Sequence, residues 1–301
     1  SGAYGISKGF YDDNGTVKFG AITPQYKEFL TEMRKWYAEG LIDAEFATND
    51  VRVIDAKVTS GEAGATITTY IKISEYNNKS IPFIAAPRPE AVSTGVTPLS
   101  PRETYIAGVG AYISKNYKYP EVAVKWLDDM YGEECSKLLN YGLEGLTYVM
   151  NEDGPQYTER ITNNQEPYIT SDPLDTRTRG YSMLESLRKY TAPNFAFLCD
   201  FERYFPAYTD NAKNATKIWS DVKDTTVKTM PQQLQLSSSE NAEYVRIMSD
   251  INTYVDEVTL KFILGISDMS EFDNYVKVVN DLGLNRILEI QQEAFNRYNT
   301  R

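Results

Sequence analysis

Aromatic rings next to hydrogen-bonding side chains give this 301-residue chain its most distinctive chemistry. The chain has 23 Tyr, 12 Phe and 3 Trp, and aromatic residues make up 13% of it. A saccharide presents apolar C–H faces and a rim of hydroxyl groups, so a site that binds one needs flat rings with donors and acceptors close by. The composition permits such binding, although core packing also accounts for many of the rings.

Two short stretches combine a ring with a neighbouring polar group. Thr69 and Tyr70 follow residues 61–68, whose small and β-branched side chains predict a buried strand, and loops at strand ends of open α/β sheets are where ligands bind. Arg102 can donate to two hydroxyls, and Tyr105 can stack on a sugar ring. We expect these four residues to contact a ligand; the alternatives are ordinary loop packing for the first pair and simple surface exposure for the second.

A third stretch is an aromatic run between residues 201 and 208. Tyr204 is the residue of this run that we expect to extend a stacking platform. The spacing of three, one and three positions suits one face of a buried helix equally well. The run consists of Phe201, Tyr204, Phe205 and Tyr208.

Several classes of chemistry are absent from the sequence. The chain has no histidine, which excludes Ser-His-Asp triads and zincin-type sites built from its own residues. Cys135 and Cys199 are far apart in sequence and are expected to be free thiols. We therefore expect no cofactor and no catalytic metal. With 42 acidic residues, a carboxylate-dependent glycoside-active enzyme remains an alternative, although its best candidate, Glu144, is expected to be a solvated loop acid.

Charge and hydropathy restrict the partners. The net charge of −11 repels phosphate backbones and anionic lipid surfaces, so nucleic acid is not expected as a partner. No apolar run approaches the roughly 20 residues that a membrane-spanning helix needs. The N-terminal sequence lacks an initiator Met and a signal-like segment, and we expect the chain to be a fragment that lacks an N-terminal part.

The elements expected around these residues alternate between helix and strand. A helix is expected over 23–40, capped by Thr23 and burying Trp36, and another over 120–142. Ser237 and Glu240 form a capping box before a long helix, and two more helices follow, the first capped by Ser270. Strands are expected within 61–68, 81–87 and 104–114, and hairpin turns at 13–15 and 153–155. The alternation predicts an α/β fold.

The order of these segments resembles one family. The stretches "YKEFLTEMRKWYAEGLIDAEFA", "GEAGATITTY", "PFIAAPRP", "YIAGVGAYIS" and "PEVAVKWLDDMYGEE", with a closing "LKFILGISDMSEFDNYVKVVNDLGLNRILEIQQEAFNRY", resemble the extracellular solute-binding proteins (family 1) of ABC importers, in particular the large lipoprotein type of Gram-positive bacteria. The resemblance implies a periplasmic-binding-protein type II-like fold of two lobes joined by a hinge, with a helical C-terminus. Residues 1–76 would be part of lobe 2, 81–150 part of lobe 1, and 151–301 a mostly helical region on lobe 2, with the hinge at 77–80.

The resemblance also implies a function. Such a protein captures an oligosaccharide or related polar solute between its lobes and delivers it to the membrane subunits of an ABC permease, without breaking a bond. We expect an extracellular monomer, anchored by an N-terminal lipid in the full-length protein. Tyr141 or Tyr148 would face the ligand at the cleft mouth, and local packing of both tyrosines is the alternative. A surface sensor or a peptide-binding protein on the same fold remains a further alternative.

Overall fold

The computed structural model describes residues 1–91, 98–99, 111–152, 154–166, 181–192, 197–220, 227–231 and 234–300. The chain divides into two compact units. Unit 1 comprises Ser1–Ile67, Ala86–Arg102 and Lys217–Arg301, and unit 2 comprises Thr68–Ala85 and Glu103–Thr216. The expected hinge residues 77–80 lie inside unit 2 and do not coincide with a boundary between the units. The assignment of 1–76, 81–150 and 151–301 to lobes stays a prediction.

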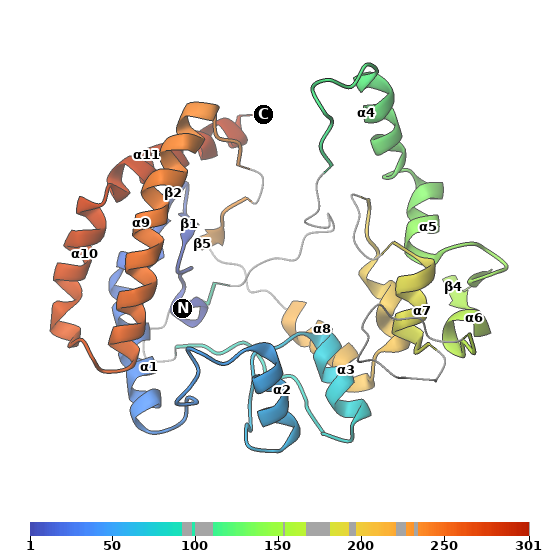
Figure 1. Cartoon of the computed structure of the whole chain (residues 1–301), viewed down its shortest axis with the longest axis horizontal. Coiled ribbons are helices and arrows are strands. Elements are labelled where there is room, and N and C mark those ends of the chain that lie inside the picture. Colours follow the sequence, from blue (N-terminus) through green and yellow to red (C-terminus); the bar gives the residue numbers. More distant parts are fainter. Residues whose placement is uncertain are drawn as a thin grey trace. The chain divides into compact units, whose positions relative to one another are not determined.

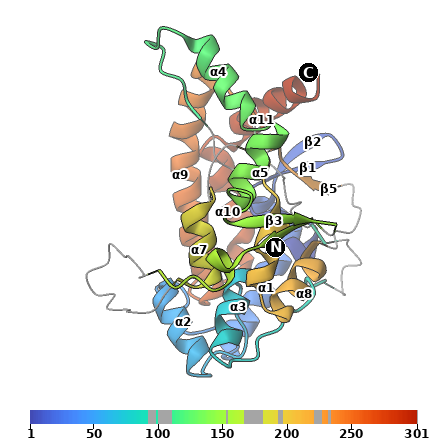
Figure 2. The same ribbon diagram turned by 90° about the vertical axis from the view of Figure 1, so that its right-hand side faces the viewer.

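Unit 1 begins with the predicted hairpin. Strands β1 (Phe10–Asp13) and β2 (Thr16–Phe19) pair antiparallel, and β5 (Val227–Thr229) pairs with β1, giving the strand order β2-β1-β5 that Figure 2 displays. Asn14 and Gly15 form the turn with φ values of 53° and 90°. The Asp12 carboxylate accepts a hydrogen bond of 2.6 Å from the Gly15 amide. The Asn-Gly signal therefore placed this turn correctly, because both residues tolerate positive φ.

The helices of unit 1 begin at the predicted caps. Thr23 accepts a hydrogen bond from the Tyr26 amide, and Pro24 is the first residue of α1. Ser237 and Glu240 form the capping box before α9. The Ser270 cap is wrong, since Asp268 is the residue whose side chain accepts from the Ser270 amide. The helices are α1 (Pro24–Ala38), α2 (Val51–Thr59), α9 (Ser238–Ile263), α10 (Phe272–Asp281) and α11 (Leu284–Asn299), with short 3-10 turns η1 (Gly2–Tyr4), η2 (Gly20–Ile22) and η4 (Met269–Glu271).

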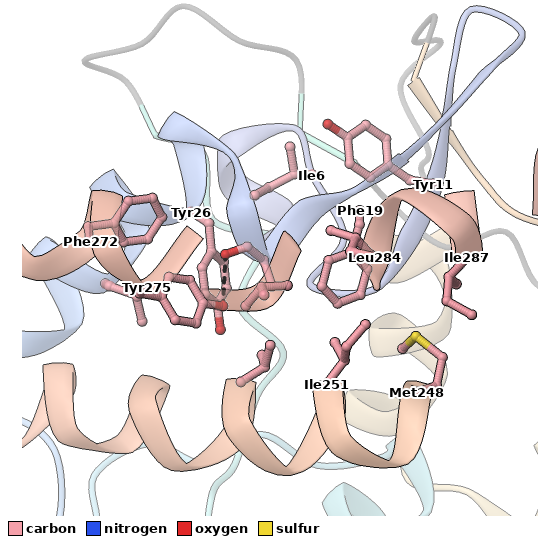
Figure 3. Close-up of a cluster of buried hydrophobic side chains, with 14 of the residues drawn as sticks. Ile6, Tyr11, Phe19, Tyr26, Met248, Ile251, Phe272, Tyr275, Leu284 and Ile287 are labelled. Carbon is pink, nitrogen blue, oxygen red and sulfur yellow. Dashed lines mark hydrogen bonds between the residues drawn. The ribbon is translucent and has the colours of Figure 1, made fainter. Parts of the chain in front are cut away.

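The core of unit 1 lies where α9 packs against α1, α10 and α11 (Figure 1). In Figure 3, Met248 and Ile251 extend from α9 into a cluster that contains Phe19 from the hairpin. The buried tyrosine hydroxyls have partners: Tyr26 contacts Thr259 at 3.0 Å, and Tyr275 donates to the Ala21 carbonyl at 3.1 Å. Segments from the two ends of the chain thus share one core.

Unit 2 consists of short helices and one hairpin. The hairpin joins β3 (Tyr148–Asn151) to β4 (Gly154–Tyr157), which confirms a hairpin at this position. Figure 2 shows β3 next to α5 and α7. α8 begins in unit 2 and ends in unit 1. The helices are α3 (Tyr70–Asn78), α4 (Pro120–Asp129), α5 (Glu133–Tyr141), α6 (Glu159–Thr162), α7 (Met183–Tyr190), the 3-10 helix η3 (Phe201–Ala207) and α8 (Asp210–Ser220).

The strands expected at 61–68 and 81–87 are not formed. Thr69 caps α3, which begins at Tyr70, and residues 81–91 form no regular element. Part of the third expected strand, 104–110, lies outside the described residues, and 111–114 is not a strand. A strand needs a neighbour that completes its hydrogen-bond ladder. Within the described ranges no segment pairs with 61–68 or 81–87, and Ile67 and Ile84 stay exposed.

Two helix predictions need correction. The single helix expected over 120–142 is divided into α4 and α5 at Met130–Gly132, where Gly132 adopts an extended conformation and precedes α5. Trp36 is exposed instead of buried, and its indole N–H donates to the Glu32 carboxylate at 2.6 Å. None of the described helices has the length and hydropathy required to cross a membrane.

Candidate ligand-binding site

One side of α3 contacts residues 204–209, and together they bring two of the predicted ligand residues into one place. We define this aromatic seam as Tyr70, Ser74 and Asn77 from α3 with Tyr204, Tyr208 and Thr209. All six lie in unit 2. The α3 residues are spaced four and three positions apart, so they lie on one face of the helix.

Rings form one end of the aromatic seam. The ring centroids of Tyr70 and Tyr208 are 5.4 Å apart at 57°, and those of Tyr204 and Tyr208 are 6.3 Å apart at 32°. Tyr208 is only 5% exposed, whereas Tyr70 and Tyr204 are half-buried. Tyr70 and Tyr204, which the sequence singles out separately, therefore both pack against a third tyrosine, Tyr208.

Hydrogen bonds form the other end. The Thr209 amide donates to the Ser74 hydroxyl at 3.0 Å, and the Thr209 hydroxyl donates to the Asn77 side-chain carbonyl at 2.9 Å. Asn77 in turn donates to the Ile81 and Phe83 carbonyls, both at 3.0 Å. This network fixes the end of α3 against the segment that begins α8.

A pocket of about 320 Å³ adjoins the hydrogen-bonded end, a volume at the lower limit of known ligand pockets. Hydroxyl, amide and carboxylate side chains contribute most of its lining, and such groups can pair with sugar hydroxyls. Apart from the polar composition around Asn77, nothing in the sequence indicated this pocket, because Ser74 and Thr209 meet only in the folded chain. The pocket is lined by Asn77, Ser80, Ile81, Pro82, Thr209, Asp210 and Asn211.

Tyr204 and Tyr208 of the aromatic seam remain protonated well above neutral pH. Burial raises the pKa of Tyr208 far above its usual range, and the nearby Tyr70 and Tyr204 raise it further. Burial also raises the pKa of Tyr204, although the Arg203 guanidinium opposes this effect. A protonated phenol both donates and accepts a hydrogen bond.

Arg203 holds η3, and with it Tyr204, against its neighbours. It is 2% exposed, and its Nη1 donates to the carbonyls of Leu139 at 3.2 Å and Ala192 at 3.1 Å. Leu139 lies in the last turn of α5, and Ala192 follows the end of α7, where the helix dipoles favour a positive charge. The guanidinium also lies 4.5 Å from the Tyr204 ring centroid. Arg203 is therefore a residue that positions Tyr204. Nothing in the sequence pointed to this role.

The predicted residues outside the aromatic seam have other surroundings. Tyr148 is buried, with its ring centroid 5.8 Å from that of Tyr141, so local packing describes both tyrosines and a ligand role for Tyr148 stays a prediction without geometric support. Thr69 is exposed and caps α3 by accepting from the Lys72 amide. Arg102 and Tyr105 lie outside the described residues.

The described residues contain no candidate metal cluster and two free thiols. Among the described residues, no group of three or more His, Cys, Asp and Glu side chains could hold a metal ion. Cys135 and Cys199 are both free thiols, and Cys199 is buried. Burial raises the pKa of the Cys199 thiol, which keeps it in the unreactive protonated form at neutral pH.

The chain is similar in sequence to known proteins. Residues 2–134 match the family model "Bacterial extracellular solute-binding protein". The chain is 22% identical to lipoprotein LipO of Bacillus subtilis (strain 168) over 299 residues, which are 95% of this chain and 54% of LipO. It thus spans about half the length of this relative.

Solved structures share the fold over nearly the whole chain. The alginate-binding protein AlgQ2 matches with a TM-score of 0.67 and 20% identity, covering 95% of this chain and 57% of AlgQ2. A human-milk-oligosaccharide (HMO) binding, ABC-transporter associated solute-binding protein from Bifidobacterium longum infantis matches with a TM-score of 0.63 and 17% identity, covering 98% of this chain and 59% of that protein. FusA of S. pneumoniae, in complex with fructo-nystose, matches with a TM-score of 0.62 and 18% identity, covering 99% and 60%.

These matches confirm the resemblance that the sequence carries. The chain is helix-rich α/β and has the type II periplasmic-binding-protein-like fold of these structures. The chain is similar to the bacterial extracellular solute-binding proteins, whose family model matches its residues 2–134.

Proposed function

We propose that this chain is part of the extracellular solute-binding component of an ABC transporter and that it binds an oligosaccharide. The observation that carries the proposal is the aromatic seam, in which the half-buried rings of Tyr70 and Tyr204 lie in one cluster. The match of residues 2–134 to the solute-binding family supports the transport role. The names of three structural relatives, which refer to alginate, HMO and fructo-nystose, support the ligand class.

In the proposed site, each kind of side chain has one task. The rings of Tyr70 and Tyr204 stack on the apolar faces of sugar rings. The side chains that line the pocket, such as Asn77 and Asp210, pair with sugar hydroxyls. Binding of this kind changes no covalent bond. In this proposal the protein therefore delivers its ligand to a permease and does not act as an enzyme.

Substitution of Tyr70 tests the site. We expect Tyr70→Ala to raise the Kd of a bound oligosaccharide about 5- to 150-fold, the effect of losing a central aromatic contact worth about 1–3 kcal/mol. Calorimetric titration with fructo-, milk- and alginate-derived oligosaccharides measures the effect, and a melting curve shows that the variant is folded. Tyr298→Ala, which removes a partly exposed ring from unit 1, is the matched control and should leave the Kd unchanged.

Three outcomes would contradict the proposal. Unchanged affinity in folded Tyr70→Ala would mean that the ligand binds elsewhere. Cleavage of the oligosaccharides, detected by chromatography of the reaction mixture, would show an enzyme instead of a binding protein. Absence of binding to every saccharide of the panel would remove the ligand class itself.

A further inference from the structure

Tyr208, at the centre of the aromatic seam, has a hydroxyl group that is buried and has no hydrogen-bond partner within the described part of the chain. We propose that this hydroxyl binds a hydroxyl group of the saccharide and that Tyr208 thereby determines ligand specificity. The inference rests on the proposed function, because it assigns one polar contact within the same site. It goes further because it names a residue that does not stack on the sugar. Instead, this residue recognises a hydroxyl group of a neutral sugar by a hydrogen bond.

Other buried tyrosines show how unusual this hydroxyl is. The large majority of buried polar side-chain atoms in proteins have a partner. In this chain the hydroxyls of two other buried tyrosines, and that of the half-buried Tyr157, have partners. Tyr26 contacts Thr259 at 3.0 Å, Tyr157 donates to the Arg203 carbonyl at 2.8 Å, and Tyr275 donates to the Ala21 carbonyl at 3.1 Å. The Tyr208 hydroxyl is the exception. It lies at the candidate ligand site, where a ligand would supply the missing hydrogen-bond partner.

The other unpaired buried groups do not point to the same site. Among the described residues, five side-chain atoms are buried without a partner. Only the Tyr208 hydroxyl belongs to the aromatic seam. Arg203 and Arg88 each form hydrogen bonds through another nitrogen of the guanidinium, so these groups are partly paired within the fold. The remaining two atoms are in Asn164 and Ser186.

Access to the hydroxyl depends on the neighbouring rings. Tyr70 and Tyr204 pack against Tyr208 and are half-buried, so a ligand that reaches Tyr208 must first displace one of these rings. Tyr70 is the first residue of α3, and rotamer changes of partly exposed side chains at binding surfaces are common. Once turned, the Tyr70 ring is in position to stack on the sugar that it admitted.

The chemistry of the hydroxyl indicates the ligand group. Its protonated form both donates and accepts one hydrogen bond, and so does a sugar hydroxyl. A carboxylate accepts only and would use half of this capacity. We therefore expect the preferred ligand to be a neutral saccharide at the position next to Tyr208.

Tyr208→Phe tests the inference because it removes only the hydroxyl oxygen. We expect a melting temperature equal to or higher than that of the wild type, since an unpaired buried polar group is lost. The Kd of the best-binding saccharide should rise about 2- to 12-fold, the effect of one neutral hydrogen bond. Tyr157→Phe is the matched control: it removes a hydroxyl that is paired within the fold, so it should lower the melting temperature and leave the Kd unchanged.

Deoxy sugars identify the contacted group. For one deoxy analogue of the ligand, the Kd of the wild type should rise by the same 2- to 12-fold factor. Tyr208→Phe should bind that analogue and the unmodified saccharide with equal Kd. Unchanged affinity of Tyr208→Phe for a saccharide that the wild type binds would overturn this inference alone. A fall in melting temperature like that of Tyr157→Phe would also overturn it, because the hydroxyl would then have a partner in the fold. A wild type that binds no saccharide would overturn the proposed function as well.

Discussion

Arg203 is a cation without an ion pair among the described residues, buried where two helices end. Its Nη1 is shared between the Leu139 and Ala192 carbonyls, and Asn140 offers its side-chain oxygen at 3.3 Å. Arginine cannot lose its proton at accessible pH, so its charge is balanced by carbonyl oxygens and ring faces. One side chain thus ties η3 to the ends of α5 and α7.

Replacement of this arginine should destabilise unit 2. We expect Arg203→Met to lower the free energy of unfolding by about 2–4 kcal/mol, because a side chain of similar length leaves buried carbonyl oxygens without their donor. Urea unfolding followed by circular dichroism measures the change. Arg160→Met, which removes an exposed ion pair with Glu166, is the control and should cost less than about 1 kcal/mol. Equal losses in the two variants would mean that Arg203 contributes no more than a surface charge.

The types of individual side chains predicted part of the candidate site. Tyr70 and Tyr204 were identified as rings in polar or aromatic stretches, and the structure brings them together through Tyr208. Ser74 was not identified, because a serine in sequence gives no sign that it will meet Thr209. Contacts between distant segments depend on the fold, which single residues do not encode.

Elements with local signals were predicted, and elements that depend on distant partners were not. The cap at Thr23, the Asn-Gly turn and the capping box at Ser237 each involve residues within four positions of one another. The strands expected over 61–68 and 81–87 require a neighbouring strand, and within the described ranges none is present. The break between α4 and α5 was missed because the apolar residues on the two sides of Gly132 were assigned to one helix. Their spacing is in fact interrupted by Glu133, Glu134 and Lys137.

The capping box of α9 predicts a pH dependence. The Ser237 amide, together with Arg297 of α11, lowers the pKa of Glu240 from 4.5 to about 2. Its carboxylate therefore stabilises the fold fully above about pH 4.5, and this contribution is lost as the pH falls toward 2. Glu240→Gln keeps a capping side chain but not the charge, so it should be less stable than the wild type at pH 7 and equally stable near pH 2.

Urea midpoints at pH 7, 4 and 2 would test this effect. Glu257→Gln is the control, since its partner Lys261 is exposed and the pair is expected to add little at any pH. A difference between the wild type and Glu240→Gln that stays constant with pH would show that the carboxylate does not titrate differently in the folded state.

For the molecule as a whole, the exposed apolar side chains of α4 are relevant to self-association. No residue of this helix is buried, and Val122, Val124 and Trp126 are all exposed. An exposed apolar helix marks either an interaction surface or a risk of aggregation. The net charge of −11 counteracts self-association but does not cover these side chains.

Trp126→Ser should therefore improve solubility without loss of stability. We expect lower light scattering in concentrated solutions and a melting temperature within about 2 °C of the wild type, because an exposed side chain contributes little to the core. Trp36→Ser on α1 is the control, since this exposed indole is held by Glu32 on a helix that is otherwise packed. Scattering that falls equally in both variants would show that α4 has no special role in self-association.

The division of unit 1 into three separate stretches has a consequence during synthesis on the ribosome. Tyr26 contacts Thr259, which is 233 positions later in the chain, and α9 supplies much of the core on which α1 packs. At a translation rate of about 5–20 residues per second, α1 emerges roughly 10–50 s before its packing partner. During this interval its apolar face has no native surface to cover it. The nascent chain thus has a long period in which this face can form non-native contacts, however stable the completed unit is.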